Sequence, residues 1–224
     1  MRQGLSPSDV FQSADLTISG VRRWREAIPS RSPGLYVVSL HPNPEEGGGM
    51  TSAPLDSGAL DSWLRRCRGL TIRERRADAV ELAAHLARWW LSGTSILYIG
   101  KAEGQSLRRR VGQYYDTPLG AQRPHGGGYW LKTLAVLPDV HVHYAEVRSD
   151  VNAGVVEDDL INAFLRLYLG VQADHPEPEL PLPWANLQVD RPPPRRRRDH
   201  GLPSLQKQQR PAPETLSGKD LRGL

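Results

Sequence analysis

The sequence predicts an α/β (α+β) domain in which a small, mainly antiparallel sheet of three strands is flanked by helices. Apolar runs at residues 33–40 and 95–100 and an alternating pattern at 140–147 predict the three strands. Residues 105–115 and 155–169 repeat apolar side chains at helical spacing, which is typical of amphipathic helices. A long stretch between the first two strands predicts a helical insertion.

Composition divides the chain into three parts. We expect an N-terminal extension at residues 1–32, a folded domain at 33–190 and a disordered, basic, Pro/Arg-rich tail at 191–224. The tail has nine Lys or Arg and three Asp or Glu, a net charge of +6, so the other residues carry −2 of the total of +4. Positive surface on the domain is therefore local, or the tail supplies it.

The single cysteine and the lack of long apolar runs limit the class of protein. Cys67 alone excludes an intrachain disulfide and a cysteine-based zinc finger, which fits a reducing cytoplasm. No stretch approaches the roughly eighteen apolar residues of a membrane span, and the first residues lack the apolar core of a signal peptide. We expect a cytoplasmic protein with no membrane partner.

In the N-terminal extension, residues 21–28 predict a short helix that ends before a proline. This helix is expected to pack Trp24 and Ile28 against the core. The first strand follows at residues 33–40 and carries Tyr36.

The insertion spans residues 41–93, and two amphipathic helices are predicted in it after an initial loop. Asp56 is expected to cap the first helix and Asp78 to begin the second, which ends at Ser92-Gly93. The apolar stripes are Leu60, Trp63, Leu64 and Cys67 in the first helix and Leu82, Leu86, Trp89 and Trp90 in the second. The insertion is a substrate-recognition or partner surface, or a brace that covers the sheet; we favour the brace.

The second strand is the centre of the sequence pattern. Its apolar run carries Tyr98 and closes with Gly100 and Lys101, as expected for a buried strand that stops at a tight turn. The next helix begins near Leu107.

That helix carries Arg110 and Tyr114 on the same stripe as its apolar residues, whereas Arg108 and Arg109 point elsewhere. An unpaired charge on an inward face is costly, so Arg110 is expected to have a partner.

The remaining candidate residues follow in the second half of the chain. A glycine-rich loop at residues 116–128 contains His125, and its glycines allow close approach to a phosphate or to a neighbouring helix. Glu157 opens the last helix and lies one position from the apolar stripe of that helix. The helix is expected to end at Gly170. Asn186 lies in a proline-bounded turn.

Together these segments resemble the GIY-YIG endonucleases. The matching motifs are Gly34-Leu35-Tyr36, Tyr98-Ile99-Gly100, Arg110 three residues after Leu107, Tyr114, Glu157 before Leu160-Ile161, and Pro183-Trp184-Ala185-Asn186. The resemblance covers about residues 33–188. No motif is specific alone, whereas their order is fairly specific.

The resemblance implies a GIY-YIG-like fold and a metal-dependent endonuclease that hydrolyses phosphodiester bonds in nucleic acid, with DNA the expected partner. Glu157 is implied to bind Mg²⁺ or Mn²⁺, since hard cations take carboxylate oxygens. Arg110 is expected to bind phosphate. Tyr36 is implied to help activate water and Tyr98 to orient water or phosphate; which tyrosine is the base stays open.

The supporting roles are less specific. Tyr114 is expected to hydrogen-bond water or phosphate, and Asn186 is implied to support the site. Lys101 is expected to contact substrate and to act as the cation that assists a phenol, whose pKa is otherwise near 10. His125 is a second candidate for substrate binding.

Two other motifs are weaker. Residues 93–101 resemble a phosphate-binding loop, but the glycine spacing is wrong and Ala102 stands where Ser or Thr is required. His141 and His143 share a strand face and could form a zinc site with His125, although a fourth ligand is lacking. The rival functions are a catalytically inactive nucleic-acid-binding module and a protein-interaction module.

Overall fold

The computed structural model describes residues 4–148, 150–171, 181–189, 196–197 and 201–203. These residues form a mixed α/β architecture with antiparallel sheets. The helices are α1 (Pro7–Gln12), α2 (Ser57–Arg66), α3 (Ala79–Ala87), α4 (Leu107–Asp116) and α5 (Ala153–Val171), with 3₁₀ helices η1 (Tyr129–Thr133) and η2 (Leu137–Asp139). The strands are β1 (Gly20–Arg23), β2 (Gly34–Ser39), β3 (Thr71–Ile72), β4 (Arg75–Arg76), β5 (Ile96–Ala102), β6 (His141–Glu146), β7 (Gln188–Val189) and β8 (Arg196–Arg197).

A four-stranded antiparallel sheet of order β1-β6-β2-β5 forms the centre of the fold. Every residue of β2 is buried, as expected for a strand that has neighbours on both sides. In the register, Tyr36 of β2 lies opposite Tyr144 of β6 and Gly100 of β5. The first tyrosine-bearing strand is therefore central, and the second is an edge strand.

The expected sheet of three strands was wrong, because β1 adds a fourth. We predicted a helix at residues 21–28, but Gly20–Arg23 pairs with β6 instead. Pairing satisfies the backbone groups along an edge of β6, whereas a helix of eight residues is marginal on its own. The predicted burial of Trp24 and Ile28 is confirmed.

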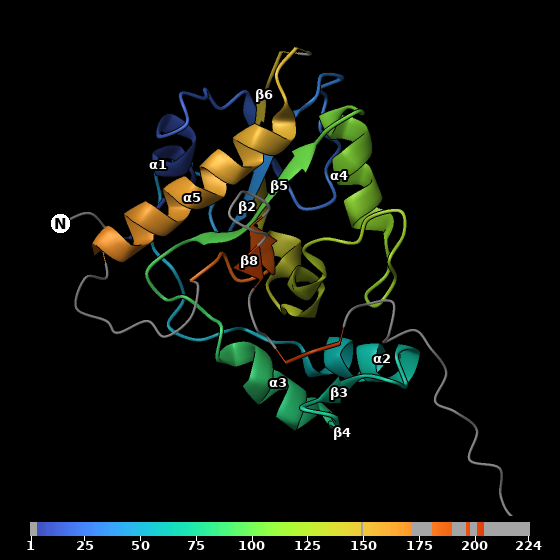
Figure 1. Cartoon of the computed structure of the whole chain (residues 1–224). Coiled ribbons are helices and arrows are strands. Elements are labelled where there is room, and N and C mark those ends of the chain that lie inside the picture. Colours follow the sequence, from blue (N-terminus) through green and yellow to red (C-terminus); the bar gives the residue numbers. More distant parts are fainter. Residues whose placement is uncertain (1–3, 149, 172–180, 190–195, 198–200, 204–224) are drawn as a thin grey trace, which may run out of the picture.

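Helices cover both faces of the sheet (Figure 1). On one face, Phe11 of α1 and Phe164 of α5 belong to one apolar cluster with Val37 of β2. On the other face, Val111 of α4 and Trp130 of η1 belong to a second cluster. The face to which a strand residue points therefore decides which of the two layers it joins.

Three predicted elements run differently in the structure. β5 does not stop at Gly100 but continues to Ala102, which pairs with Gly34, and the turn follows at Gly104 with φ +67°. α5 does not end at Gly170 but runs through it. β6 is not half-buried, because it lies between β1 and β2 and most of its residues are buried.

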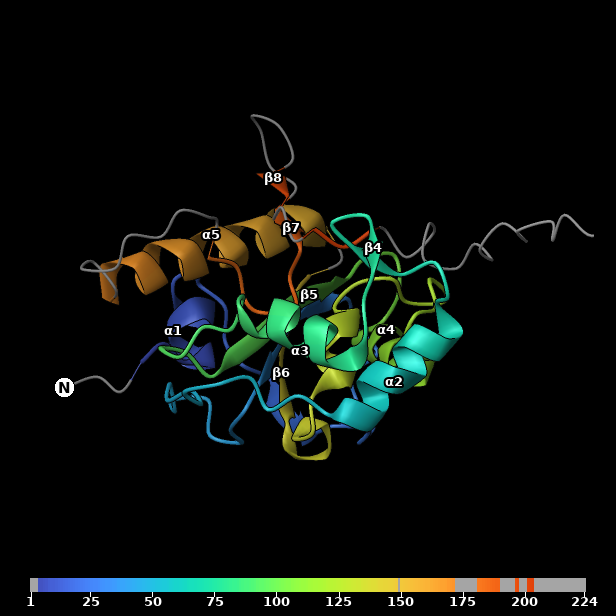
Figure 2. The same ribbon diagram turned by 90° about the horizontal axis from the view of Figure 1, so that it is seen from below.

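The two helices predicted in the insertion are confirmed, with Asp56 and Asp78 as their N-caps. A short hairpin of β3 and β4, which the sequence analysis did not predict, lies between them (Figure 2). α3 ends at Ala87, before the two tryptophans that were expected on it. The Nε1 of Trp90 instead donates a hydrogen bond to the carbonyl of Met50 at 2.7 Å.

The insertion packs against η1. α2 contacts both α3 and η1, and the ring of Trp63 meets that of Tyr129 edge-on, with centroids 5.5 Å apart. The indole Nε1 of Trp184 donates to the carbonyl of Leu86 in α3 at 3.1 Å. Through these contacts the insertion packs on the η1 layer.

The C-terminal segment is described only in part. β8 pairs with β7, and Leu202 is buried in the same cluster as Trp130. The rest of the predicted tail at 191–224, and most of the proline-rich stretch at 174–185, lie outside the described residues. In the part of the chain that the structure describes, no helix is long and apolar enough to cross a membrane.

Candidate active site

Tyr36 of β2 and Tyr98 of β5 lie side by side on the α4 face of the sheet. The antiparallel register pairs Tyr36 with Gly100 and Tyr98 with Val38, so these four positions share a face. The ring centroids are 6.0 Å apart. A Cβ at position 100 would lie 2.7 Å from Cζ of Tyr36 and from Cε1 of Tyr98. Glycine is therefore required at this position by two aromatic rings rather than by a turn.

α4 brings Arg110 and Tyr114 to the same layer. The ring centroid of Tyr114 is 5.5 Å from that of Tyr98 and 6.5 Å from that of Tyr36. Its hydroxyl donates a hydrogen bond to the carbonyl of Gly128. Arg110 is partly buried, as expected from its position on the inward stripe of the helix.

His125 reaches this cluster from the loop between α4 and η1. Its backbone N–H donates to Oγ1 of Thr117 at 3.0 Å. Its Nδ1 lies 3.1 Å from the carbonyl oxygen of Gly127, and because a carbonyl only accepts, Nδ1 carries the proton. Nε2 is then an acceptor, and the hydroxyl of Tyr36 donates to it at 3.0 Å. The imidazole also stacks on Tyr114, with centroids 4.3 Å apart.

The imidazole of His125 is held in its neutral form. Burial, together with the positive charges of Arg110 and Lys132, lowers its pKa to about 3. A neutral imidazole whose lone pair faces a phenol is a proton acceptor. His125 was expected to bind substrate, whereas the structure places it against Tyr36.

The three phenols are uncharged as well. Burial raises the pKa of Tyr36, Tyr98 and Tyr114 above the ordinary value. The carboxylate of Glu157 adds to this rise at Tyr36 and Tyr98, and the guanidinium of Arg110 opposes it. Both groups are therefore close enough for their charges to act on the phenol oxygens.

Glu157 forms an ion pair with Lys101 beside the cluster. Lys101 is three residues from Tyr98 on β5, so its side chain starts from the opposite face of the strand. Its Nζ is 3.5 Å from Oε2 of Glu157 and 3.3 Å from Oε2 of Glu103. Although burial lowers the pKa of Lys101, the two carboxylates raise it above the ordinary value. Lys101 therefore balances the charge of Glu157, whereas the charge of Arg110 acts on the phenols of Tyr36 and Tyr98.

Asn186 supports β5 at its open edge. Its Oδ1 accepts from the N–H of Ile99 at 2.8 Å, and its Nδ2 donates to the carbonyl of Ile99 at 2.9 Å. Because Ile99 stands between Tyr98 and Gly100, this side chain takes the place of a strand partner at the centre of the site. The contact agrees with the supporting role that the resemblance implies.

Replacing Asn186 with alanine should lower the free energy of unfolding by about 2–3 kcal/mol, because two buried backbone groups of Ile99 lose their partner. Urea denaturation measures the loss. Asn162→Ala on α5 is the matched control, and it should change stability by no more than about 0.5 kcal/mol. Equal effects of the two substitutions would contradict the supporting role.

Lys132 of η1 also belongs to this layer, although it was not among the residues predicted for the site. Its Nζ donates to the carbonyl of Tyr114 at 2.6 Å and to the carbonyl of Thr117. These carbonyls belong to the C-terminal end of α4, where a positive charge is favourable. Burial lowers the pKa of Lys132 to about 8. The ammonium joins the two ends of the loop that carries His125, a contact between distant segments that no local pattern indicates.

The carboxylate of Glu157 can serve a hard cation but not a zinc site. Mg²⁺ binds one or two carboxylates and keeps several waters, and Glu157 supplies one such carboxylate. Zinc requires three or four protein ligands, and among the described residues no group of three or more His, Cys, Asp or Glu could hold a metal ion. The donor chemistry therefore fits Mg²⁺ or Mn²⁺, provided that Lys101 releases one carboxylate oxygen.

The histidine pair of β6 does not join His125. His143 lies opposite Val37 and shares its face of the sheet, whereas His125 bonds Tyr36 on the other face. The zinc alternative is therefore not formed by these three residues. Residues 93–101 run into β5 and form no phosphate-binding loop.

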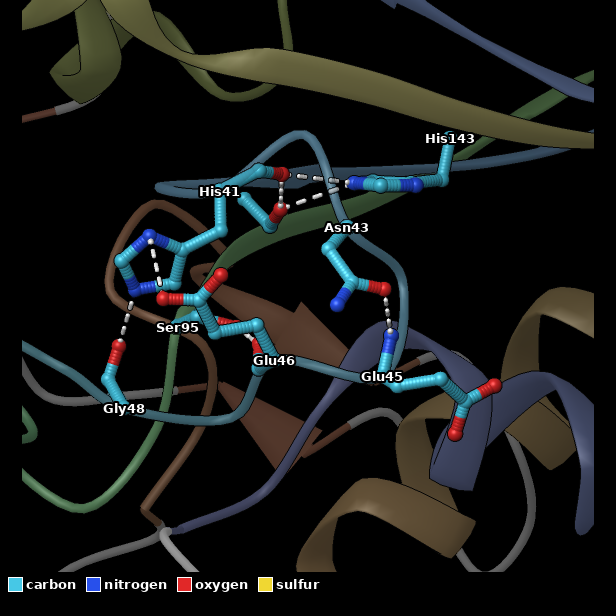
Figure 3. A network of polar contacts seen from close by, with 8 residues as sticks. His41, Asn43, Glu45, Glu46, Gly48, Ser95 and His143 are labelled. Atoms are coloured by element: carbon cyan, nitrogen blue, oxygen red, sulfur yellow. Dashed lines mark hydrogen bonds and ion pairs between the residues drawn. The ribbon is translucent and has the colours of Figure 1, made fainter.

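His143 instead holds the loop that follows β2 (Figure 3). Its Nε2 lies 3.0 Å from the carbonyl of His41 and 3.0 Å from Oγ of Ser39. Nε2 therefore carries a proton and donates it to the carbonyl. Burial lowers the pKa of this imidazole to about 4, which keeps the ring neutral near pH 7. The Nε2 of His41 donates in turn to the carbonyl of Gly48 at 2.7 Å. This network fixes the loop and is separate from the tyrosine cluster.

Comparison of this chain with protein-family models, with curated proteins and with solved structures finds no match.

Proposed function

We propose that this chain is a metal-dependent endonuclease that hydrolyses phosphodiester bonds in DNA, on a fold similar to that of the GIY-YIG endonucleases. One observation carries the proposal: motif residues that are far apart in the sequence converge at one place in the fold. Tyr36, Tyr98, Arg110 and Tyr114 form one cluster, and Glu157 lies at its side. Motifs that matched by chance would not be expected to bring their side chains together in the fold.

Arg110 and the Tyr36–His125 pair supply the protein's part of the chemistry. Arg110 is a fixed cation that can bind a phosphate and stabilise the charge that develops on it. A proton from the attacking water passes to the oxygen of Tyr36 while the phenol proton moves to Nε2 of His125. A phosphate at Arg110 would offset the positive field on His125, which raises the pKa of the imidazole and makes it a better base.

Glu157 would hold Mg²⁺ or Mn²⁺. When bound, such a cation stabilises negative charge on phosphate oxygens and makes a bound water more acidic. Until then, Lys101 keeps the carboxylate in place and balances its negative charge. Tyr98, whose phenol feels the charges of both Glu157 and Arg110, would orient the phosphate or the water.

A second function is favoured by the burial of the phenols. Tyr36 is fully buried and only 1% of Tyr114 is exposed, so substrate reaches these oxygens only if the loop that contains His125 moves. A nucleic-acid-binding or protein-interaction module on the same fold needs no such movement. The two functions differ in whether phosphodiester bonds are broken.

Nicking of supercoiled plasmid tests the proposal. The full chain should nick DNA with Mg²⁺ or Mn²⁺ and fail to do so with a chelator, and both Glu157→Gln and Arg110→Gln should remove the activity. Nicking that persists in both variants would overturn this site. DNA binding without nicking by the unmodified protein would favour the second function.

A further inference from the structure

Part of the insertion carries a dense positive charge on its surface. Residues 65–76 contain six arginines and one acidic residue, Glu74, and all seven side chains are exposed. The arginines are Arg65, Arg66, Arg68, Arg73, Arg75 and Arg76. Residues 1–190 carry a net charge of −2. Because residues 65–76 contribute +5 to this total, the other residues of 1–190 have a net negative charge.

The arginines at 73, 75 and 76 lie on the hairpin of β3 and β4. Thr71 pairs with Arg76 and Ile72 with Arg75. The two turn residues between them, Arg73 and Glu74, have φ of 48° and 66°. Glycine and asparagine are the usual residues in such a turn, so the fold alone gives no reason for Arg73.

A hollow of about 280 Å³ lies between the hairpin and α3. Its lining includes Arg73, Arg75 and Arg88, with Glu81 and His85. The carboxylate of Glu81 already accepts a hydrogen bond from the backbone of the helix N-cap at 3.2 Å. Among the residues that the structure describes, no carboxylate forms an ion pair with these three arginines. The hollow is therefore a site with spare positive charge, of a size that admits a phosphate group.

The same segment touches the loop that covers the tyrosine cluster. A Cβ at Gly120 would lie 2.6 Å from Sγ of Cys67 and 3.2 Å from Cδ of Arg66. The Sγ of Cys67 also donates to the carbonyl of Gly120 at 3.8 Å. In Figure 2 the hairpin lies beside α2 and α3, above both helices in this view. The link from this segment to the loop that contains His125 therefore runs through Arg66 and Cys67.

We propose that the arginine hairpin, residues 71–76 together with Arg88, binds the backbone of duplex DNA and positions it for the candidate active site. A two-stranded ribbon fits the major groove of B-DNA, and guanidinium groups bind phosphate and guanine in bidentate geometry. The deep, narrow major groove of duplex RNA does not admit such a ribbon. The proposal rests on the proposed function for the fate of the DNA, but binding can be measured without cleavage.

Fluorescence anisotropy of a labelled DNA duplex, measured on the full chain in chelator over a range of salt, tests the proposal. Arg73→Gln/Arg75→Gln should weaken binding about tenfold near 0.1 M salt and reduce the magnitude of the salt slope by about 2, for two lost phosphate contacts. Arg88 lines the other side of the hollow, and Arg88→Gln should reduce the magnitude of the salt slope by about 1. The charge-matched control is Arg148→Gln/Arg166→Gln, at exposed positions before and on α5, and it should stay within about threefold of the unmodified protein.

Several outcomes would overturn the hairpin site: no duplex binding by the unmodified protein, hairpin and control variants that bind alike, or an RNA duplex that competes better than DNA. Plasmid nicking separates this proposal from the proposed function. If the hairpin variants lose binding but the unmodified protein never nicks, the hairpin site holds and the nuclease fails. If nicking occurs and the hairpin variants bind like the control, the nuclease holds and the hairpin site fails.

Discussion

Replacing Glu157 with glutamine should reduce metal-dependent nicking by about 10³-fold or more. Glutamine keeps the shape of the side chain but removes the charge that a divalent cation requires. The substitution also breaks the ion pair with Lys101, which costs stability by no more than about 1 kcal/mol because both groups are partly exposed. Arg110→Gln should cost about 10²–10³ in rate, the size expected for the loss of one group that stabilises developing charge.

Matched substitutions on the same helices make this prediction specific. Asp159→Asn lies two residues from Glu157 on α5, and Arg108→Gln lies two residues from Arg110 on the exposed side of α4. Each removes the same charge without touching the cluster, so each should retain nicking within about threefold. Initial rates at saturating plasmid, with thermal unfolding as a check of the fold, give the comparison. Equal losses in the cluster and control variants would show a general charge effect rather than a site.

The strands and helices with a clear apolar period could be read from the sequence. β2, β5 and α4 begin within two residues of their expected starts, because buried runs and amphipathic stripes are local signals. The inward face of α4 followed from the same spacing. To predict that Tyr36 and Tyr98 lie on the same face of two paired strands, only the alternation of side chains along each strand and the register of the pair are needed.

Elements without such a period were missed. α1 is six residues long, although Ser6 and Asp9 form a capping box that the sequence displays. The hairpin of β3 and β4 turns on Arg73 and Glu74, which give none of the usual turn signals. Its strands have two residues each, too few for a pattern.

The partners of the charged and polar side chains could not be predicted from the sequence either. Lys101 was expected to assist a phenol. It pairs with Leu35, which lies in the α5 layer, and Lys101 forms ion pairs there with Glu157 and Glu103. The bond between Tyr36 and His125 joins residues 89 positions apart. Such contacts depend on how a loop folds over a sheet, which local spacing does not encode.

Lowering the pH from 7.5 to 5 should reduce the free energy of unfolding by about 4 kcal/mol through His125 and His143. Burial lowers their pKa to about 3 and about 4, from 6.5 in the unfolded chain. Burial is the largest cause, and these values already include the charges of Arg110 and Lys132 at His125 and of His141 at His143. Below pH 6.5 the unfolded chain gains protons that the folded protein does not bind, so stability falls as the pH falls. Each imidazole contributes about 1.36 kcal/mol per pH unit, or about 2 kcal/mol by pH 5.

Urea denaturation at pH 7.5, 6 and 5 measures this loss, and two variants assign it. His143→Gln retains an N–H donor for the carbonyl of His41 but cannot titrate, so it should remove about half of the pH dependence. His125→Gln should remove the other half. Wild-type pH dependence in both variants would contradict neutral, buried imidazoles. The two halves have different consequences, because protonation of His125 removes the acceptor of the Tyr36 hydroxyl and frees the loop over the tyrosines, whereas protonation of His143 occurs at Nδ1 and leaves the hydrogen bond from Nε2 to the carbonyl of His41 in place.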